Sequence, residues 1–391
     1  MAYKKNSALA NSAIIGIDAI NLRGGGGQTH LIEILAAVDP NSIGVKQVVV
    51  WGNIDLLNKL VDRYWLKKVS IDTFASSSIK RIFWQLFILP RVAVKAGCSC
   101  LFAPGGTVFT GALPTVTMCR NLLPFDSSQK SLYGFSIFRI KLELLKCLQL
   151  FSFKKANLVI FLSDFAREVV CHKVPSVDRK AIKIPHGVNK RFLLKPRLQI
   201  PISEYSYAKP FSVLYVSTIE YYKNHDTVLE AFNRLRRFKR WPLRLVLVGD
   251  ARPIMKKYLI SKIQKYNSAE PWVEYRGKVS YQELHEFYGF ADLGVFASSC
   301  ENLPNTLIEM MTAGLPIVSS SRPPMTEVLG DGGMYFDPRS VEDAYQCFEL
   351  MIENHNLRLE LAKKSFQIGR QYNWQTCSEQ TFRKLVSLCS E

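Results

Sequence analysis

Short runs of apolar residues alternate along the chain with longer amphipathic stretches. Apolar runs bounded by turn residues are typical of strands buried in a parallel sheet, and the longer stretches repeat their apolar residues at the spacing of a helix. Because a strand, a helix and a strand in succession make a βαβ unit, the pattern predicts an α/β fold with parallel sheets.

These elements form two successive series. In the first series, strands are expected at residues 13–18, 46–51, 100–103, 115–118, 158–162 and 181–184, and helices at 28–38, 79–96, 132–155 and 164–172. In the second series, strands are expected at 212–217, 243–249, 273–275, 293–297, 316–319 and 334–336, and helices at 225–238, 253–267, 281–290, 305–313 and 341–353. A last amphipathic helix is expected at 374–388.

The chain is expected to form two domains, because 391 residues exceed what one hydrophobic core comfortably holds. The turn at Pro185-His186-Gly187-Val188 follows the last strand of the first series and predicts the junction. The proline-interrupted segment 196–210 is expected to be a surface connection. We expect a first domain at residues 1–187, a second at 188–370 and a C-terminal helical segment at 371–391.

The composition and the net charge limit the classes of protein to which this chain can belong. Apolar residues make up 48% and charged residues 21% of the chain, as in globular proteins, and the formal net charge of +18 favours an anionic partner. The nine cysteines show no spacing typical of zinc ligands, so reduced thiols are expected. No run approaches the ~20 apolar residues of a membrane span, which predicts a soluble or peripheral protein.

Residues 135–155 combine lysines and arginines with many leucines and phenylalanines. Such a helix can lie on an anionic membrane, and it can also be a core helix whose lysines face solvent. The sequence leaves both alternatives open. Aromatic residues do not interleave with basic ones as they do in platforms that stack bases, so nucleic acid is not expected as a partner.

Two glutamates, Glu301 and Glu309, straddle the predicted start of a helix. This helix follows the buried strand at 293–297, and the first backbone N–H groups of a helix attract phosphate. Carboxylates beside them can accept hydrogen bonds from the hydroxyls of a ribose or another sugar. The order of strand, loop and helix therefore predicts a site for a nucleotide sugar.

Cations and glycines follow other predicted strands. Lys223 lies where the loop after residues 212–217 meets a helix, so its ammonium can meet a diphosphate. The glycine run 24–27 follows the first strand, where glycines let the backbone approach a ligand, although a flexible turn is an alternative. Arg120 follows the strand at 115–118 and can point into the crevice of an open α/β sheet or serve a structural role.

Together these segments resemble the retaining glycosyltransferases of family 4. The match is most specific across residues 301–338, where Glu301 and Glu309 correspond to the paired glutamates of the family, and it extends weakly over most of the chain. The resemblance implies the GT-B architecture, in which two Rossmann-like parallel-sheet domains face each other across a cleft. The first domain would bind the acceptor and the second the nucleotide sugar, and the C-terminal helix would return to the first domain.

The resemblance also implies roles for individual residues. Glu301 would contact hydroxyls of the donated sugar, Glu309 the ribose and Lys223 the diphosphate. The residues implied as catalytic are Glu301, Lys223 and Arg120. Those implied as donor-binding are Glu309, Asn302, Leu303, Asn305, Thr306, Thr218, Gly249 and Val279, and the implied diphosphate or acceptor loop is Gly25, Gly26 and Gly27.

The chain departs from the family pattern at several of these positions. Thr218 stands where many members have a diphosphate-binding arginine, which leaves more of that task to Lys223. Asn302 and Pro304 replace glycines, so fewer amides face the phosphates. Arg120 stands where many members carry a histidine near the donor sugar, which leaves the identity of the sugar open.

We therefore expect a metal-independent hexosyltransferase that moves a sugar, with retention, from a UDP- or GDP-linked donor to a carbohydrate or lipid-linked acceptor. The expected setting is cell-surface polysaccharide or lipopolysaccharide synthesis in the cytoplasm. Peripheral contact at the inner face of the cytoplasmic membrane is left open. No DxD-type metal motif accompanies the site, and no cofactor besides the nucleotide sugar as co-substrate is expected.

Two other classes of protein remain as alternatives. A basic, non-catalytic protein that binds an anionic membrane or nucleic acid would explain the charge but leave the two glutamates without a purpose. A dinucleotide-dependent oxidoreductase would use the same kind of sheet, with an acid about 20 residues after the glycine run to bind the ribose. Asp55 lies just beyond the second predicted strand, so this alternative fits the sequence poorly.

Overall fold

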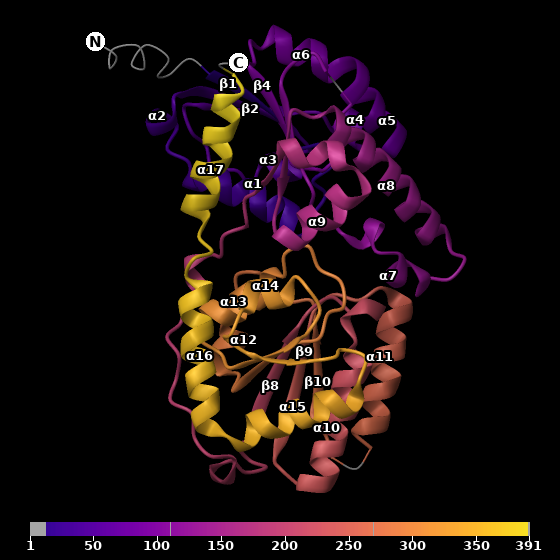
Figure 1. Ribbon diagram of the computed structural model, residues 1–391, viewed down its shortest axis with the longest axis vertical. Coiled ribbons are helices and arrows are strands. Elements are labelled where there is room, and N and C mark those ends of the chain that lie inside the picture. The colour runs from indigo at the N-terminus through magenta and orange to yellow at the C-terminus, as the bar shows by residue number, and fades with distance from the viewer. Residues whose placement is uncertain (1–12, 110, 269, 390–391) are drawn as a thin grey trace. The chain divides into compact units, whose positions relative to one another are not determined.

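The computed structural model describes residues 13–109, 111–268 and 270–389 (Figure 1). The described chain divides into two compact units. The first unit comprises the residues up to Gly187 together with those from Asn373 onward, and the second unit comprises Val188–Tyr372. Each unit contains one sheet whose strands are all parallel, so the predicted α/β class with two Rossmann-like domains is confirmed.

The sheet of the first unit has seven strands in the order β3-β2-β1-β4-β5-β6-β7. The strands are β1 (Ala13–Asp18), β2 (Val45–Gly52), β3 (Leu66–Ser70), β4 (Cys100–Ala103), β5 (Thr115–Met118), β6 (Leu158–Phe161) and β7 (Ala181–Lys183). The strand β3 was not predicted, because this edge strand is only partly buried and its two lysines interrupt the apolar pattern.

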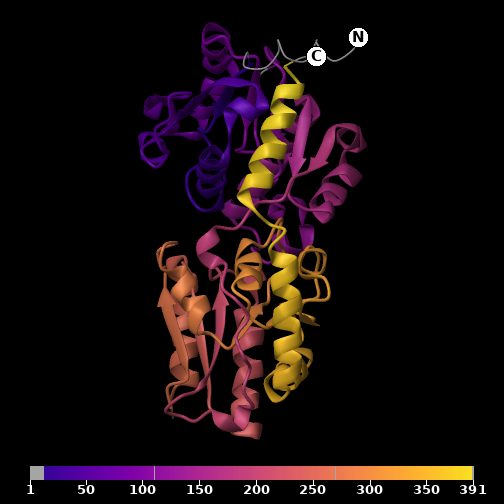
Figure 2. The same ribbon diagram turned by 90° about the vertical axis from the view of Figure 1, so that its left-hand side faces the viewer.

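The helices of the first unit surround this sheet (Figures 1 and 2). They are α1 (Gly26–Ala37), α2 (Pro40–Ile43), α3 (Ile54–Leu57), α4 (Asp72–Ala75), α5 (Ser78–Phe83), α6 (Leu89–Lys95), α7 (Ser127–Ser131), α8 (Ile137–Lys155), α9 (Asp164–Lys173) and α17 (Trp374–Ser387). The C-terminal helix α17 packs against α1, where Ser378 Oγ donates to Ile34 O at 2.7 Å.

Two predicted helices of the first unit differ from the observed ones. The helix expected at 79–96 is divided by a π-helical turn at Trp84–Ile88. Pro90 follows this turn, and a proline has no N–H to continue a regular helical ladder. The helix expected at 132–155 begins only at Ile137, because Ser136 caps it by accepting a hydrogen bond from the Arg139 amide.

The sheet of the second unit has six strands in the order β10-β9-β8-β11-β12-β13. The strands are β8 (Phe211–Val216), β9 (Leu243–Val248), β10 (Val273–Gly277), β11 (Leu293–Phe296), β12 (Ile317–Ser320) and β13 (Met334–Phe336). The helices are α10 (His225–Lys239), α11 (Pro253–Tyr266), α12 (Leu284–Phe290), α13 (Asn305–Thr312), α14 (Met325–Leu329), α15 (Val341–Glu353) and α16 (His355–Gly369). The sequence did not predict α14 and α16.

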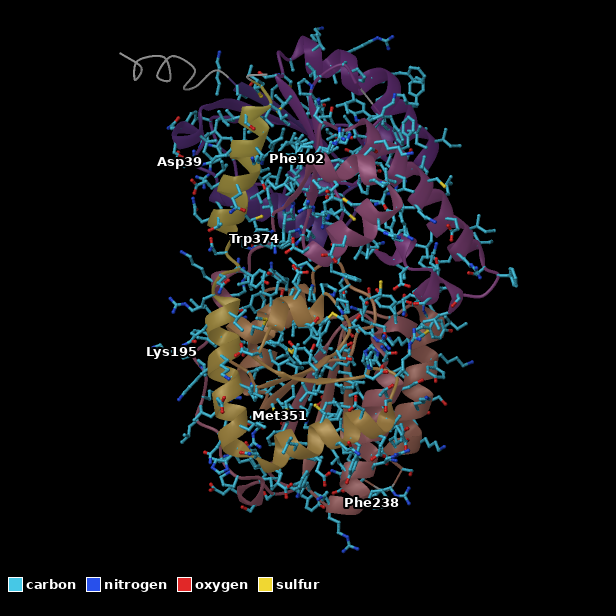
Figure 3. All side chains as sticks on the ribbon, viewed as in Figure 1. Asp39, Phe102, Lys195, Phe238, Met351 and Trp374 are labelled. Atoms are coloured by element: carbon cyan, nitrogen blue, oxygen red, sulfur yellow. The ribbon has the colours of Figure 1, made fainter. Side chains whose placement is uncertain are left out.

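The core of each unit lies between its sheet and its helices. Figure 3 labels Phe102 in the first unit and Met351 in the second, and both side chains are fully buried. The rings of Phe232 on α10 and Phe348 on α15 stack with centroids 4.5 Å apart, which fixes these helices on one face of the second sheet. Among the described helices, none has the length and apolar character needed to cross a membrane.

Candidate functional site

The strand order of the second sheet reverses at β8, which lies between β9 and β11. In open α/β sheets, ligands bind outside the carboxyl ends of the strands at such a switch point. The loops that leave this edge beside each other are residues 217–224 after β8 and residues 297–304 after β11. These two loops contain Lys223 and Glu301, for which the sequence most clearly predicted a role in binding.

Asn224 ties the two loops together. Its backbone is left-handed, with a φ of 50°, and its side-chain amide donates to Ala297 O and to Ser299 Oγ, each at 2.7 Å. The Ser299 amide in turn donates to Tyr222 O at 2.7 Å. Because these bonds cross between the loops, they hold the residues on either side in fixed positions.

Lys223 and Glu301 form an ion pair across these loops. Both side chains are largely buried, with exposed fractions of 10% and 16%. The Lys223 ammonium also lies 5.2 Å from the ring centroid of Tyr222 and 5.5 Å from that of Phe296. Burial has the largest single effect and would lower the pKa of Lys223, but the charge and hydrogen bond of Glu301, together with Tyr215, raise the pKa above its usual value. Lys223 is therefore a cation at neutral pH.

Tyr215 and His225 support the backbone of Lys223. The Tyr215 hydroxyl donates to Lys223 O at 2.7 Å, and the His225 ring stacks on the Tyr215 ring with centroids 4.8 Å apart. Burial, followed by the charge of Lys223, lowers the pKa of His225 to about 3, so this ring is neutral. Sequence reasoning gave neither residue a role, because a buried aromatic in a strand and a polar residue at a helix start are common in any α/β protein.

Glu309 lies on α13, which begins at Asn305 without a side-chain cap. The carboxyl is buried, and its Oε2 accepts a hydrogen bond of 2.8 Å from the Tyr288 hydroxyl of α12. Burial raises the pKa of Glu309 to about 8, against a smaller opposite effect of Tyr288. At neutral pH Glu309 is therefore mainly protonated. The sequence gave no sign of Tyr288 as its partner.

Glycines allow the loops after β8, β9 and β10 to approach each other closely at this edge of the sheet. A side chain at Gly249, after β9, would collide with the carbonyl oxygen of Ser217. The Gly249 amide donates to Gly277 O at 2.8 Å, and the Tyr275 hydroxyl donates to Gly249 O at 2.9 Å. The carboxyl ends of β8, β9 and β10 therefore lie close together.

The predicted site residues of the second unit all lie on this edge or on α13. Lys223 and Glu301 are in direct contact, and Asn305 Oδ1 is buried without a hydrogen-bond partner. The remaining predicted residues occupy the adjoining loops and the first turns of α13: Thr218, Gly249, Val279, Asn302, Leu303, Thr306 and Glu309. Their roles stay predictions.

Arg120, Gly25, Gly26 and Gly27 belong to the first unit and form a group of their own. A Cβ atom at Gly27 would lie 2.7 Å from Arg120 Nη1, so the guanidinium rests directly on the backbone at the start of α1. Arg120 Nη1 is buried and has no hydrogen-bond partner. Burial lowers the pKa of Arg120 to about 10, which leaves it a cation at neutral pH.

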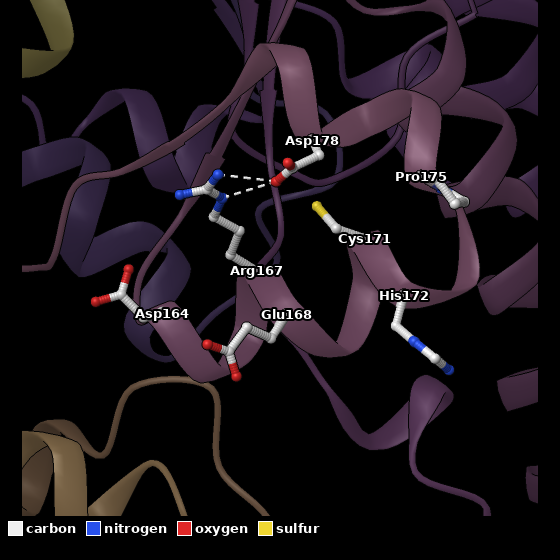
Figure 4. Close-up of a pocket in the computed structure, with 7 residues that line it drawn as sticks. All are labelled: Asp164, Arg167, Glu168, Cys171, His172, Pro175 and Asp178. Carbon is white, nitrogen blue, oxygen red and sulfur yellow. Dashed lines mark hydrogen bonds and ion pairs between the residues drawn. The ribbon is translucent and has the colours of Figure 1, made fainter.

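An open groove of about 610 Å³ lies on the first unit and contains none of the predicted site residues (Figure 4). Its lining residues are Asp164, Arg167, Glu168, Cys171, His172, Pro175 and Asp178. Arg167 pairs with Asp178 at 2.8 Å, and Asp164 pairs with Lys183. Because Arg167, Asp178 and Asp164 are already engaged in ion pairs, few of the charged groups of the groove remain to bind a ligand.

The described residues include no group of three or more histidine, cysteine, aspartate or glutamate side chains that could hold a metal ion. The candidate site of the second unit therefore consists of a paired cation, two carboxyls and a helix N-terminus. Such a set can bind a diphosphate and the hydroxyls of a sugar.

Known proteins resemble this chain in sequence. Residues 199–367 match the family model described as glycosyl transferases group 1. The O-antigen chain mannosyltransferase B of Escherichia coli is 24% identical over 232 residues, which cover 59% of this chain and 60% of the relative. A serotype-specific mannosyltransferase WbdA of Escherichia coli is 22% identical over 264 residues, or 66% of this chain and 32% of the relative. The chain thus matches less than two thirds of the length of either relative.

Solved structures resemble the fold over nearly the whole chain. Alr3699/HepE of Anabaena, solved in complex with UDP and glucose, has a TM-score of 0.69 and 16% identity, covering 96% of this chain and all of that one. WaaG, a glycosyltransferase involved in lipopolysaccharide biosynthesis, has a TM-score of 0.68 and 15% identity, covering 95% of this chain and 99% of that one. These likenesses and the family match confirm the predicted GT-B fold class and the predicted family resemblance.

Proposed function

Because residues 199–367 match the family model of the glycosyl transferases of group 1, we propose that the chain is a retaining hexosyltransferase. It would move a sugar from a UDP- or GDP-linked donor to a carbohydrate or lipid-linked acceptor. The observation that carries this proposal is the buried pair of Lys223 and Glu301 at the switch point of the second sheet, beside the start of α13.

Lys223 would neutralise the departing diphosphate. When the bond between the sugar and the donor phosphate breaks, its electron pair passes to the phosphate oxygen, and a fixed cation stabilises that charge. The ion pair with Glu301 keeps Lys223 protonated and in place before the donor binds. A donor phosphate would take over the ammonium, and Glu301 would then be released to accept hydrogen bonds from the hydroxyls of the sugar.

Glu309 would bind the ribose of the donor. A protonated carboxyl has both a donor and an acceptor for hydroxyl groups, and the Tyr288 hydroxyl holds its orientation by donating to Oε2. Asn305 Oδ1, at the start of the same helix, is a buried acceptor with no partner and could receive a hydrogen bond from the ligand. These groups support nucleotide binding by the second unit, with acceptor binding assigned to the first.

The names of the relatives suggest the biological setting. The two Escherichia coli proteins are named as mannosyltransferases, one of them for the O-antigen chain. We therefore assign this chain to cell-surface polysaccharide or lipopolysaccharide synthesis on the cytoplasmic side of the membrane, with a hexose as the transferred sugar. No metal ion or nucleic acid is assigned a part in this reaction.

Helix α8 supports peripheral contact with the cytoplasmic membrane. Ile137, Ile140 and Leu144 recur at helical spacing on α8 and are 73%, 69% and 60% exposed. Arg139 and Lys141 lie between them on the same turns. Exposed apolar side chains beside cations are typical of a helix on an anionic membrane surface.

Flotation with vesicles tests this membrane contact. The full chain should float with vesicles that contain anionic lipid and should float less after the double substitution Ile137→Ser and Ile140→Ser. Ile254→Ser on α11 is a matched control, because Ile254 is also 72% exposed. Equal flotation of all three proteins, or of none, would exclude α8 as a membrane contact.

Release of a nucleoside diphosphate tests the proposed reaction. The purified chain should release UDP or GDP from one hexose donor when a suitable acceptor extract is present, and EDTA should not stop the release. Lys223→Ala should abolish most of this release, whereas Lys209→Ala, which changes an exposed lysine before β8, should not. Equal release by wild type and Lys223→Ala would remove Lys223 from the site.

A further inference from the structure

Two thiols of the first unit meet where α17 ends. Cys100 is the first residue of β4, and its Sγ lies 3.5 Å from Leu385 O. Cys389 follows just after α17, and its Sγ donates to the same oxygen at 3.2 Å. A hydrogen bond also joins the two thiols directly. Because the two cysteines are far apart in the sequence, only the packing of α17 against β4 brings them together (Figure 1).

The surroundings of the two thiols give them different reactivity. Cys100 is fully buried, and its hydrogen bond to Cys389, followed by burial, raises its pKa. Cys389 is only partly buried, and the hydrogen bond from Cys100 lowers its pKa against the opposite effect of burial. An accessible thiol that ionises readily and lies beside a second thiol is typical of cysteines that respond to oxidants. Cys389 is therefore the thiol that an oxidant meets first.

Cys98 lies close to this pair but in a different environment. It packs with Trp51 and Leu101 in a buried apolar cluster of the first unit. Burial, together with the charge of Cys389, raises the pKa of Cys98 to about 11, so its thiol is protonated at neutral pH. Cys100, which is hydrogen-bonded to Cys389, is therefore the better placed of the two to react with it.

We propose that Cys389 and Cys100 are a redox-sensitive pair, which a peroxide converts into a reversible disulfide that fastens the end of α17 to β4. The contact of both sulfurs with one carbonyl oxygen carries this proposal, since it places the two thiols together in the reduced chain. The proposal does not depend on glycosyl transfer.

The reaction proceeds in two balanced steps. The Cys389 thiolate attacks one oxygen of hydrogen peroxide, the O–O bond breaks and hydroxide leaves, so Cys389 is oxidised to a sulfenic acid and the peroxide is reduced. The Cys100 sulfur then attacks the Cys389 sulfur. The S–O bond breaks as the S–S bond forms, and the Cys100 proton leaves with the hydroxide as water.

The disulfide would secure a segment that noncovalent contacts otherwise hold. Helix α17 comes last in the chain but belongs to the first unit, where it packs against α1 and β4. A covalent bond between its end and an inner strand of the sheet restricts the unfolded chain and so stabilises the folded unit. In a reducing compartment such a bond forms only transiently, during exposure to an oxidant.

Mass spectrometry of the full chain tests the proposal. The reduced protein is treated with hydrogen peroxide, freed of the excess and digested without reductant. Wild type should yield a cross-linked peptide pair that joins Cys100 to Cys389, lighter by two hydrogen atoms than the two separate peptides. Dithiothreitol should remove the cross-link.

Single substitutions identify the partners. Cys389→Ser and Cys100→Ala should each abolish the cross-link, whereas Cys98→Ser should retain it. Cys147→Ser is the matched control, because Cys147 is an exposed cysteine of α8, and it should also retain the cross-link. If Cys100→Ala does not fold, Cys389→Ser still tests the pair, since it changes a partly exposed residue beyond the last helix.

Thermal unfolding tests whether the bond fastens α17. Peroxide treatment should raise the thermal midpoint of wild type by about 3 °C or more, and dithiothreitol should reverse the rise. Cys389→Ser, treated in the same way, should show no rise, which also controls for oxidation of other residues.

Three results would overturn the proposal. The first is wild type without a cross-link after peroxide treatment, including a chain in which Cys389 is oxidised only to a sulfinic acid. The second is a cross-link from Cys389 to Cys98 in place of Cys100. The third is a cross-link between Cys100 and Cys389 that leaves the thermal midpoint unchanged, which would show that the bond does not secure α17.

Discussion

The two units place a cation at the carboxyl edge of a parallel sheet, but only one of the cations has a partner. Lys223 in the second unit pairs with Glu301. Arg120 in the first unit pairs with no described residue, although its Nη1 is buried. The difference is that a fixed carboxylate already compensates the charge of Lys223, whereas the described part of the chain provides no such carboxylate for Arg120.

The glycines at the two edges differ in the same way. Gly249 approaches the carbonyl oxygen of Ser217, which belongs to the rigid backbone of the next loop. Gly27 approaches the end of the flexible Arg120 side chain. Gly249 in the second unit is therefore packed against backbone, whereas Gly27 in the first unit is packed against the end of a side chain.

The largest predicted effect concerns turnover. Lys223→Ala should lower kcat about 10²- to 10³-fold, because it removes a fixed charge that acts on the departing diphosphate. Steady-state kinetics of donor consumption measures this change, with Lys209→Ala as the control. An unchanged kcat would show that Lys223 has only a structural role. The proposed difference between Lys223 and Arg120 would then be wrong.

The ion pair itself should contribute to stability. Removing one partner of a largely buried pair leaves the other charge uncompensated, so Glu301→Leu or Lys223→Met alone should lower the free energy of unfolding by about 3 kcal/mol. The double substitution should recover much of this loss. Urea unfolding measures all three variants. Arg120→Gln should change the free energy of unfolding little, because it removes a charge that has no partner. A loss as large as for Lys223→Met would show that Arg120 is also paired in the folded chain.

The pH dependence of the free energy of unfolding should reveal the raised pKa of Glu309. Its pKa is raised to about 8 in the folded chain, so between its unfolded pKa and pH 8 the folded state binds more protons than the unfolded state. Stability due to this group is therefore highest at low pH and falls as the pH rises to 8. Glu309→Gln cannot ionise, so its free energy of unfolding relative to wild type should increase from pH 5 to pH 9 by more than about 1 kcal/mol.

The same substitution should weaken donor binding about tenfold, because the amide keeps a single acceptor oxygen, which the Tyr288 hydroxyl already uses, and so has none left for the ribose. Glu353→Gln, which changes an exposed carboxylate at the end of α15, is the control for both measurements. If the stability difference between wild type and Glu309→Gln is the same at pH 5 and pH 9, Glu309 is not protonated in the folded chain.

The smallest predicted effect concerns Tyr288. Tyr288→Phe removes the hydrogen bond to Glu309 Oε2 and should lower the free energy of unfolding by about 1 kcal/mol. Tyr207→Phe is the control, since the Tyr207 hydroxyl bonds to Arg240 O on the surface. A larger loss for Tyr207→Phe would show that the buried carboxyl does not depend on its tyrosine.

The sequence predicted most of the fold because buried parallel strands read as short apolar runs. It missed β3, an edge strand whose two lysines interrupt the apolar pattern, and it missed the π-helical turn at Trp84–Ile88. That turn places Trp84 Nε1 3.2 Å from a carboxylate oxygen of Asp18 at the end of β1, a long-range contact with no local signature. Such elements depend on tertiary packing, which periodicity does not report.

The sequence predicted which residues could form the candidate site, but it did not predict the contacts between them. Lys223 and Glu301 were expected to serve one ligand, since both follow neighbouring strands, but their mutual ion pair depends on the exact path of two loops. The raised pKa of Glu309 depends on its burial in the folded second unit and could not be predicted from the chain alone. The isolation of Arg120 likewise depends on which groups the fold leaves around it.

The most direct test of the central claim is a thermal shift measurement with UDP, GDP, ADP and dTDP, each with and without EDTA, on wild type and Lys223→Ala. We predict that one of these diphosphates raises the thermal midpoint of wild type, that EDTA leaves the shift unchanged, and that Lys223→Ala loses it. No shift with any of the four, at concentrations well above a micromolar affinity, would contradict the assignment of a nucleotide-sugar site to the second unit.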